Sequence, residues 1–336
     1  MNNSDIGAKD ILENTGHNTE NHSDHNQENQ DVFTSLLNEL GDHAGFYIGP
    51  HKISELPVIL IDDGLHIYAS PSSMLKEGVY TIKGHGEIVR TSDGGKPTLD
   101  LSITNLVVFQ WIAIIFLTFV FTKVGKLFKK EPTKAPKGLQ NVVETFVSYI
   151  RDEVVRPNIP SRKTADTLLP YFLGLFFFIL VLNLIGLIPG GHTATGAIPV
   201  TLALAITAFF VINITAMRVS GVGNWFKHLT GGAPWYLWPI MIPIEFVGLF
   251  IKPFALTIRL FANMSAGHIV LFSLLGLLFF FGNILLAPAI VGFSIFIYFL
   301  ELLVAFLQAY IFTMLTAIFV GLAIGEHGHE EAHETH

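Results

Sequence analysis

The chain of 336 residues contains no cysteine, and only 14% of its residues are charged. Without cysteine it can form no disulfide framework and has no thiol for catalysis or metal binding. Roughly a quarter of the residues of an average soluble domain are charged, so the charged fraction of this chain is low. Half of its residues (51%) are hydrophobic. The composition therefore indicates a protein that is embedded in a membrane.

Two common functional signals are also missing. The polar N-terminal segment has no apolar core followed by a small-residue cleavage site, so we expect no signal peptide. Gly94-Gly-Lys-Pro-Thr98 lacks the spacing of a phosphate-binding loop, so any nucleotide chemistry would belong to partner proteins. We expect no nucleic acid, no cofactor and no resident metal. For the tail at 326–336, rich in His and Glu, a solvated segment is favoured, with metal binding as the alternative.

The charged residues are segregated, which predicts four regions. Residues 1–46 are rich in Asn, Asp, Glu and His, a composition typical of disorder. Residues 47–104 contain two runs, Pro57–Gly64 and Val79–Val89, that alternate or stay apolar between Gly and Pro, which predicts a small β-rich cap outside the membrane. Residues 105–325 form the predicted membrane domain, and the cytoplasmic tail follows.

Apolar runs predict the first membrane helices. One extends from Leu106 to about Phe121 and is followed by a cluster of lysines. The apolar spacing near Gly138–Val155 predicts an amphipathic helix at the membrane interface. A stretch without charged residues, broken at Pro189-Gly-Gly191, predicts a hairpin of two helices, at Leu168–Ile188 and about Ile198–Met217.

The last two apolar regions, Trp235 to about Phe281 and Leu286 to about Ile324, are too long for perpendicular helices of roughly 20 residues. Each either contains a short hairpin or is one long, strongly tilted helix, and length alone does not decide between them. The predicted fold class is an all-α polytopic membrane protein. It has about five membrane-embedded helices, an amphipathic interfacial helix and a small β-rich N-terminal extension.

The short loops differ in their content of lysine and arginine. Basic residues occupy the loop from Lys123 to Lys163 and the loop that holds Arg218 and Lys227, whereas the loops at 190–196 and 282–287 have none. Basic loops stay on the cytoplasmic side of a membrane. We therefore expect the N-terminal cap outside and the C-terminal tail in the cytoplasm, and five crossings agree with that orientation.

Arg259 lies inside a long apolar stretch, with its closest carboxylates along the chain at Glu245 and Glu301. A guanidinium at membrane depth costs from about 2.5 to well over 10 kcal/mol. Unlike a buried lysine, it cannot lose its proton to escape that cost. Because this chain offers little to pair with it, Arg259 indicates a carboxylate partner on another protein.

Further polar residues accompany Arg259. Glu245, Lys252 and Arg259 recur every seven residues, so they line one stripe of a helix, and Asn263 extends that stripe by one turn. His268 is rotated to about the opposite side of the same helix. The simplest alternatives are an ion pair between Glu245 and Lys252 and an interhelical hydrogen bond for Asn263.

In the last apolar region, Glu301 and Gln308 are again seven residues apart and share a face. An interhelical hydrogen bond is the simpler role for Gln308. His268 and Glu301 have complementary chemistry, because an imidazole and a carboxylate can both accept and release a proton. Purely structural hydrogen bonding is the alternative for this pair.

The segment Lys252–His268, with its core Arg-Leu-Phe-Ala-Asn-Met, and the segment Leu307–Leu315 resemble subunit a of the rotary F-type ATP synthases. The likeness covers about Ile103–Ile324. It implies a proton-translocating stator subunit of the Fo sector in the cell inner membrane, with two offset half-channels and no catalytic site of its own. It also implies that the last two helices tilt around a c-subunit ring. The other implied partners are the subunit b peripheral stalk, the F1 sector and the lipid bilayer.

The resemblance and the stripe together predict seven residues for proton translocation: Arg259, Glu245, His268, Glu301, Gln308, Asn263 and Lys252. The resemblance implies that Arg259 faces the ring carboxylate and that Glu245 belongs to the cytoplasmic half-channel. It also implies that His268 and Glu301 belong to the outer half-channel. The last two stand in exchanged order compared with some bacterial members. Pro199 stands where the hairpin often has Asn, and the N-terminal hundred residues have no counterpart in compact members.

Two other classes of membrane protein fit the sequence less well. A secondary transporter would usually show inverted repeats and paired broken helices, and we find no repeat. A plain membrane scaffold would not need an arginine such as Arg259 at membrane depth.

Overall fold

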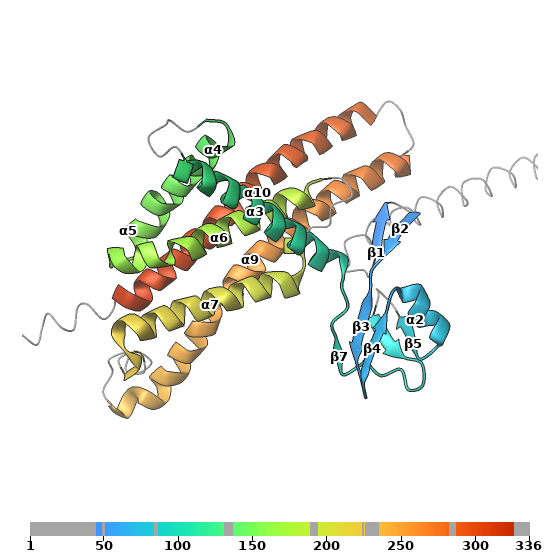
Figure 1. Cartoon of the computed structure of the whole chain (residues 1–336), viewed down its shortest axis with the longest axis horizontal. Coiled ribbons are helices and arrows are strands. Elements are labelled where there is room, and N and C mark those ends of the chain that lie inside the picture. Colours follow the sequence, from blue (N-terminus) through green and yellow to red (C-terminus); the bar gives the residue numbers. More distant parts are fainter. Residues whose placement is uncertain are drawn as a thin grey trace, which may run out of the picture. The chain divides into compact units, whose positions relative to one another are not determined.

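The computed structural model describes residues 45–48, 51–83, 87–130, 137–188, 194–223, 225, 235–281 and 287–325 (Figure 1). The chain divides into two compact units, one made of Met1–Asn105 and Ala266–Leu300, the other of Leu106–Ser265 and Glu301–His336. The expected disorder at 1–44, the hairpin break at 189–191 and the tail at 326–336 lie outside the described residues. The division into four regions stays a prediction.

Short antiparallel strands make up most of the N-terminal cap, as predicted. The strands form two hairpins, β1-β2 and β5-β6, and a three-stranded sheet with the order β4-β3-β7. Side chains of alternate positions in β3 are fully buried, and they share a small core with a methionine, two tyrosines and an isoleucine of neighbouring elements. The strands are β1 (Gly45–Ile48), β2 (His51–Glu55), β3 (Val58–Ile61), β4 (Leu65–Tyr68), β5 (Tyr80–Lys83), β6 (Glu87–Arg90) and β7 (Leu99–Asp100).

The sequence analysis missed one helix in the cap, α2 (Pro71–Glu77). Its signals are local. Ser70 caps the N-terminus, because its Oγ accepts from the backbone N–H of Ser73 at 3.1 Å while the Ser70 N–H donates to Ser73 Oγ, also at 3.1 Å. Pro71 suits the first helical turn, and Gly78 ends the helix at φ +77°. Seven residues are too few to show a helical period among strand-like runs.

A buried carboxylate ties the cap together. Asp62 is 4% exposed and accepts hydrogen bonds from the Arg90 guanidinium, from Tyr80 Oη at 3.1 Å and from Thr98 Oγ1 at 3.2 Å. These donors come from β5, β6 and the segment before β7, so one side chain links three parts of the cap. The hydrogen bonds from Arg90, ahead of those from Tyr80 and Thr98, hold the pKa of Asp62 well below its usual range despite its burial.

Among the described residues, five helices are long and apolar enough to cross a membrane, which confirms the predicted number. The first continues beyond Phe121 through its lysines, because lysine is a good helix former whose long side chain can reach water. The five are α3 (Asn105–Lys130), α6 (Arg162–Gly186), α7 (Ile198–Ser220), α9 (Trp238–Phe281) and α10 (Ala287–Gly325).

The last two helices are single and continuous, so neither contains the hairpin that the sequence left possible. α9 has 44 residues and α10 has 39. At 1.5 Å per residue they are about 66 and 58 Å long, so each can remain within an apolar layer of about 30 Å only if it is strongly tilted. Pro243 and Pro253 lie inside α9 without ending it.

Short helical pieces connect α3 to α6 where the sequence predicts an amphipathic helix. They are α4 (Leu139–Tyr149), the π-helical turn η1 (Ile150–Val155) and α5 (Arg156–Asn158). The ring of Phe146 lies 6.0 Å from that of Phe176 in α6 and 6.1 Å from that of Phe306 in α10. The connection therefore packs against both helices.

Buried side chains of η1, α6, α7, α9 and α10 form one apolar core in the helical unit. Near its C-terminal end, α10 passes close to the end of α5. A Cβ built on Gly321 would fall far inside van der Waals contact with the backbone oxygen of Asn158 in α5. Only glycine allows α10 to pass the end of α5 at this distance.

Candidate functional site

Arg259 lies on the exposed side of α9. Its neighbours Leu256, Leu260 and Met264 are 0–2% exposed and pack into the core of the helical unit, whereas the Arg259 side chain is exposed. Within the described part of the chain, no ion pair or hydrogen bond to its guanidinium is seen. The helix thus packs its apolar face into the core and presents a cation beside that face, at the exposed surface.

Asn263 and Gln308 are brought together across the contact between α9 and α10. Asn263 Nδ2 donates to Gln308 Oε1 at 2.8 Å. Gln308 is 1% exposed, and its own Nε2 has no hydrogen-bond partner among the described residues. Because Asn263 is one turn after Arg259, this pair of amides lies next to the arginine along α9.

The continuous course of α9 keeps Glu245, Lys252 and Arg259 two turns apart on one stripe. Glu245 and Lys252 are half-buried. The Lys252 ammonium lies 5.6 Å from the centre of the Phe319 ring of α10, within the range of a cation–π contact. Lys252 is therefore held against α10, whereas Arg259 is presented outward.

His268 and Glu301 are both buried, at 9% and 3% exposure. The His268 ring packs edge-on against Phe272, one turn further along α9, with 6.3 Å between the ring centres. A titratable group buried in an apolar helix is costly and is usually functional in membrane proteins. The predicted pairing of His268 with Glu301 stays a prediction.

Sequence reasoning missed a polar network that joins three helices beside this region. Asn183 of α6 donates from Nδ2 to the Ala305 carbonyl of α10 at 3.0 Å, and its Oδ1 accepts from Thr195 Oγ1 at 2.6 Å. In α9, Ser265 Oγ donates to the Gly196 carbonyl at 3.1 Å. The 3-10 turn η2 (Ala194–Gly196) thereby links α6 to α9. The signal available in the sequence was the amide side chain of Asn183 within the uncharged stretch of α6.

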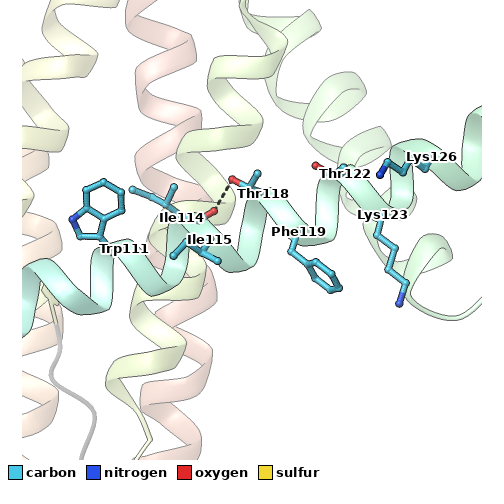
Figure 2. Close-up of a pocket in the computed structure, with 8 residues that line it drawn as sticks. All are labelled: Trp111, Ile114, Ile115, Thr118, Phe119, Thr122, Lys123 and Lys126. Carbon is cyan, nitrogen blue, oxygen red and sulfur yellow. Dashed lines mark hydrogen bonds between the residues drawn. The ribbon is translucent and has the colours of Figure 1, made fainter.

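A shallow hollow on α3 carries none of the predicted site residues (Figure 2). All of its lining side chains come from this single helix, so it is an exposed helix face and no enclosed path for ions. Its lining is mostly apolar and ends at two lysines, as on a lipid-facing helix near the membrane surface. The residues are Trp111, Ile114, Ile115, Thr118, Phe119, Thr122, Lys123 and Lys126.

Five apolar helices, two of which carry polar and ionisable side chains along their length, define a multi-pass membrane protein of ion transport. Residues 107–321 match the family model described as ATP synthase A chain. The chain therefore belongs to the ATP synthase A chain family, as the resemblance in the sequence indicated, and is a component of the Fo sector that works in a complex with other ATP synthase subunits.

Relatives support the same assignment. The chain is 52% identical over 236 residues to "ATP synthase subunit a" of Chloroherpeton thalassium, covering 70% of each chain. It is 48% identical over 261 residues to "ATP synthase subunit a 2" of Prosthecochloris aestuarii, covering 76% of this chain and 79% of the relative. A relative in Anaeromyxobacter sp., also named "ATP synthase subunit a", is 47% identical over 264 residues.

Proposed function

We propose that this chain is the proton-translocating stator subunit of a rotary ATP synthase, in which Arg259 faces ionised carboxylates on a rotating ring of c subunits. The observation that carries the proposal is the exposure of Arg259 on an apolar helix, without an ion-pair partner among the described residues. A guanidinium at membrane depth needs water or a carboxylate. A carboxylate that arrives from a second protein can pair with the guanidinium without forming a permanent ion pair.

Electrostatics then couples proton flow to rotation. A protonated ring carboxylate is neutral and can move into lipid, which an ionised one cannot do at low cost. Near Arg259 the opposite charge favours the ionised form, so the ring site releases its proton there. The fixed cation also repels a passing proton and blocks a direct leak. The membrane potential drives each charge with about 2.3 kcal/mol per 100 mV.

Two half-channels lead to this contact. We assign Glu245 and the neighbouring Lys252 to the cytoplasmic path, and His268 and Glu301 to the outer path. The burial of His268 and Glu301 supports this assignment, because an enclosed path needs titratable groups shielded from bulk water. Asn263 lies between the two sets along α9, near the contact with the ring, and the buried Gln308 of α10 accepts its hydrogen bond. In this proposal the protein lies in the cell inner membrane. Its N-terminus is outside and its C-terminus is in the cytoplasm.

The exposed surface of the two long helices is evidence for a large protein partner. Only 11% of the most apolar stretch of α9 and of α10 is buried, compared with 39% for α6 and for α7. Of the five membrane helices, the two that carry the predicted site residues are thus the least covered by the described part of the chain. We assign their uncovered surface to the c-subunit ring, with the subunit b stalk and the F1 sector as further partners of the complex.

The test is to replace Arg259 with alanine and to measure ATP-driven proton pumping in inverted membrane vesicles. We expect Arg259→Ala to abolish pumping, because nothing then induces the ring carboxylate to release its proton. The control is Arg218→Ala, which removes an exposed arginine from the last turn of α7 and should leave pumping intact. Normal pumping by an assembled Arg259→Ala complex would refute the proposal.

A further inference from the structure

One face of the cap sheet is an array of six aliphatic side chains. Ile59 of β3 pairs with Ile67 of β4 and Ile61 pairs with Leu65, while β7 adds Leu99 opposite Ile61. The Leu101 N–H donates to the Ile59 carbonyl at 2.9 Å and continues this register. Since side chains alternate between the faces of a sheet, all six point to the same side, in two rows of three.

Within the described part of the chain, five of these six side chains are exposed and Ile59 is half-buried. Leu65 and Ile67 are 63% and 64% exposed, Leu99 and Leu101 are 49% and 51% exposed, and Ile61 is 38% exposed. The opposite face is the cap's core, where Val58, Leu60 and Tyr68 pack against Met74 of α2. The cap therefore has a sufficient core without the six aliphatic residues. A contiguous apolar patch of this kind marks a protein interface or a membrane contact.

The composition of the face favours lipid over protein. None of its six side chains is charged, aromatic or able to form a hydrogen bond. Protein interfaces are enriched in Tyr, Trp, Phe, Met and Arg, which dominate their binding energy. A purely aliphatic surface can instead be buried among acyl chains just below the headgroups, as amphipathic helices bury their apolar side by about 5–10 Å.

The chain itself holds this face close to the membrane. The ladder beside β3 continues to Ile103, whose N–H donates to the Pro57 carbonyl at 3.1 Å. Two residues later, at Asn105, the membrane helix α3 begins. The four steps from Leu101 to Asn105 span at most about 14 Å at ~3.5 Å per residue. Since one headgroup layer is about 5–8 Å thick, Leu101 cannot leave the neighbourhood of the lipid surface.

We infer that the aliphatic face of the β4-β3-β7 sheet docks onto the lipid surface. The cap is then a membrane-resting element whose six aliphatic side chains enter the headgroup boundary. This contact restrains the N-terminal part of the chain independently of proton translocation, so it does not rest on the proposed roles of Arg259 and the half-channel residues.

The natural absence of cysteine makes a direct test possible. Ile67→Cys places a thiol on the aliphatic face, and the control Lys76→Cys places one at an exposed position of α2, which packs on the other side of the sheet. Each complex is spin-labelled and reconstituted into vesicles of phosphatidylcholine and phosphatidylglycerol. The complex with the unsubstituted chain is the labelling blank.

Collisions with oxygen, which concentrates in lipid, are then compared with collisions with a water-soluble nickel chelate. We expect the ratio of oxygen to nickel accessibility to be several-fold higher at position 67 than at 76, and Leu99→Cys to behave like Ile67→Cys. Equal nickel access at 67, 99 and 76 would mean that the face lies in water. Protection from both reagents at 67 and 99 would mean that protein covers it. Either result overturns the inference.

Discussion

At the scale of single residues, the proposed mechanism requires a neutral side chain at Gln308, so that Arg259 stays available to the ring carboxylate. Gln308 is buried and bonded to Asn263, one turn from the arginine. We predict that Gln308→Glu inhibits proton pumping, because the new carboxylate competes with the ring for the guanidinium. About 1.4 kcal/mol of competing attraction slows ring release roughly tenfold. The measurement is the initial rate of ATP-driven pumping in inverted vesicles.

The control for this prediction is Gln308→Met, which has a similar volume but adds no charge. It removes only the bond to Asn263. Interhelical bonds of this kind contribute about 0.6 kcal/mol on average, so its pumping rate should change by less than about threefold. If both substitutions reduce pumping equally, packing and not charge sets the requirement at this position.

Asp62 makes the stability of the cap depend on pH. Its hydrogen bonds from Arg90 lower its pKa in the folded state, so folding favours the ionised carboxylate. That stabilisation is fully present above the unfolded carboxyl pKa of about 3.9 and is lost as the pH falls below it. We predict faster amide exchange in β3 and β6 below about pH 4, after correction for the intrinsic rate.

The matched control is Asp62→Asn, whose amide does not titrate. Its cap should be weaker at neutral pH, because Arg90 loses its anionic partner, and should lack the additional acid-induced opening. An unchanged pH profile in the variant would assign the acid effect to other carboxylates, such as Asp93, which also contacts Arg90.

The sequence could predict the positions of the polar residues but not their contacts. A seven-residue period is sufficient to align Glu245, Lys252 and Arg259, because α9 is a regular helix. The bond between Asn263 and Gln308 depends on how far α10 is shifted along α9, which no periodicity specifies. The same limit hid the network around Asn183, whose acceptor Ala305 contributes only a backbone carbonyl.

At the scale of elements, the crossing of α10 over the end of α5 depends on Gly321. The added methyl group of Gly321→Ala would overlap the Asn158 backbone oxygen, which cannot rotate away as a side chain can. We predict a loss of about 1–3 kcal/mol, the usual cost of overpacking. It would be measured as a lower unfolding temperature of the purified complex.

Gly125→Ala in α3 provides the comparison, because no atom lies within 4 Å of its added Cβ. Alanine is favoured over glycine inside a helix by up to about 1 kcal/mol, so this variant should be neutral or slightly more stable. Equal unfolding temperatures for the two variants would show that α10 can shift away from α5 without cost.

Elements with a strong period were predictable from the sequence, and those that depend on tertiary packing were not. The five membrane helices follow from apolar runs of sufficient length. Whether α9 is continuous could not be read from the sequence, because Pro243 and Pro253 can either break or kink a helix, depending on what satisfies the freed backbone groups. Gly321 has no sequence signal of its own, since its role comes from a residue 163 positions away, Asn158.

At the scale of the whole molecule, composition alone indicates a membrane protein, and the distribution of lysine and arginine predicts its orientation. The orientation stays a prediction, which vesicle experiments can test. Such experiments are favoured here by the absence of cysteine, since any introduced thiol is the only one in the chain.

The two ends of α3 allow that orientation to be tested with matched substitutions. Lys76→Cys lies in the cap before α3, and Lys126→Cys lies near the C-terminal end of α3. In sealed inverted vesicles, a membrane-impermeant maleimide should label Lys126→Cys at once and Lys76→Cys only after detergent opens the vesicles, because the apolar part of α3 separates the two positions. Vesicles of the opposite orientation should reverse the order. Labelling of Lys76→Cys alone in intact inverted vesicles would place the cap in the cytoplasm and reverse the assignment of both half-channels.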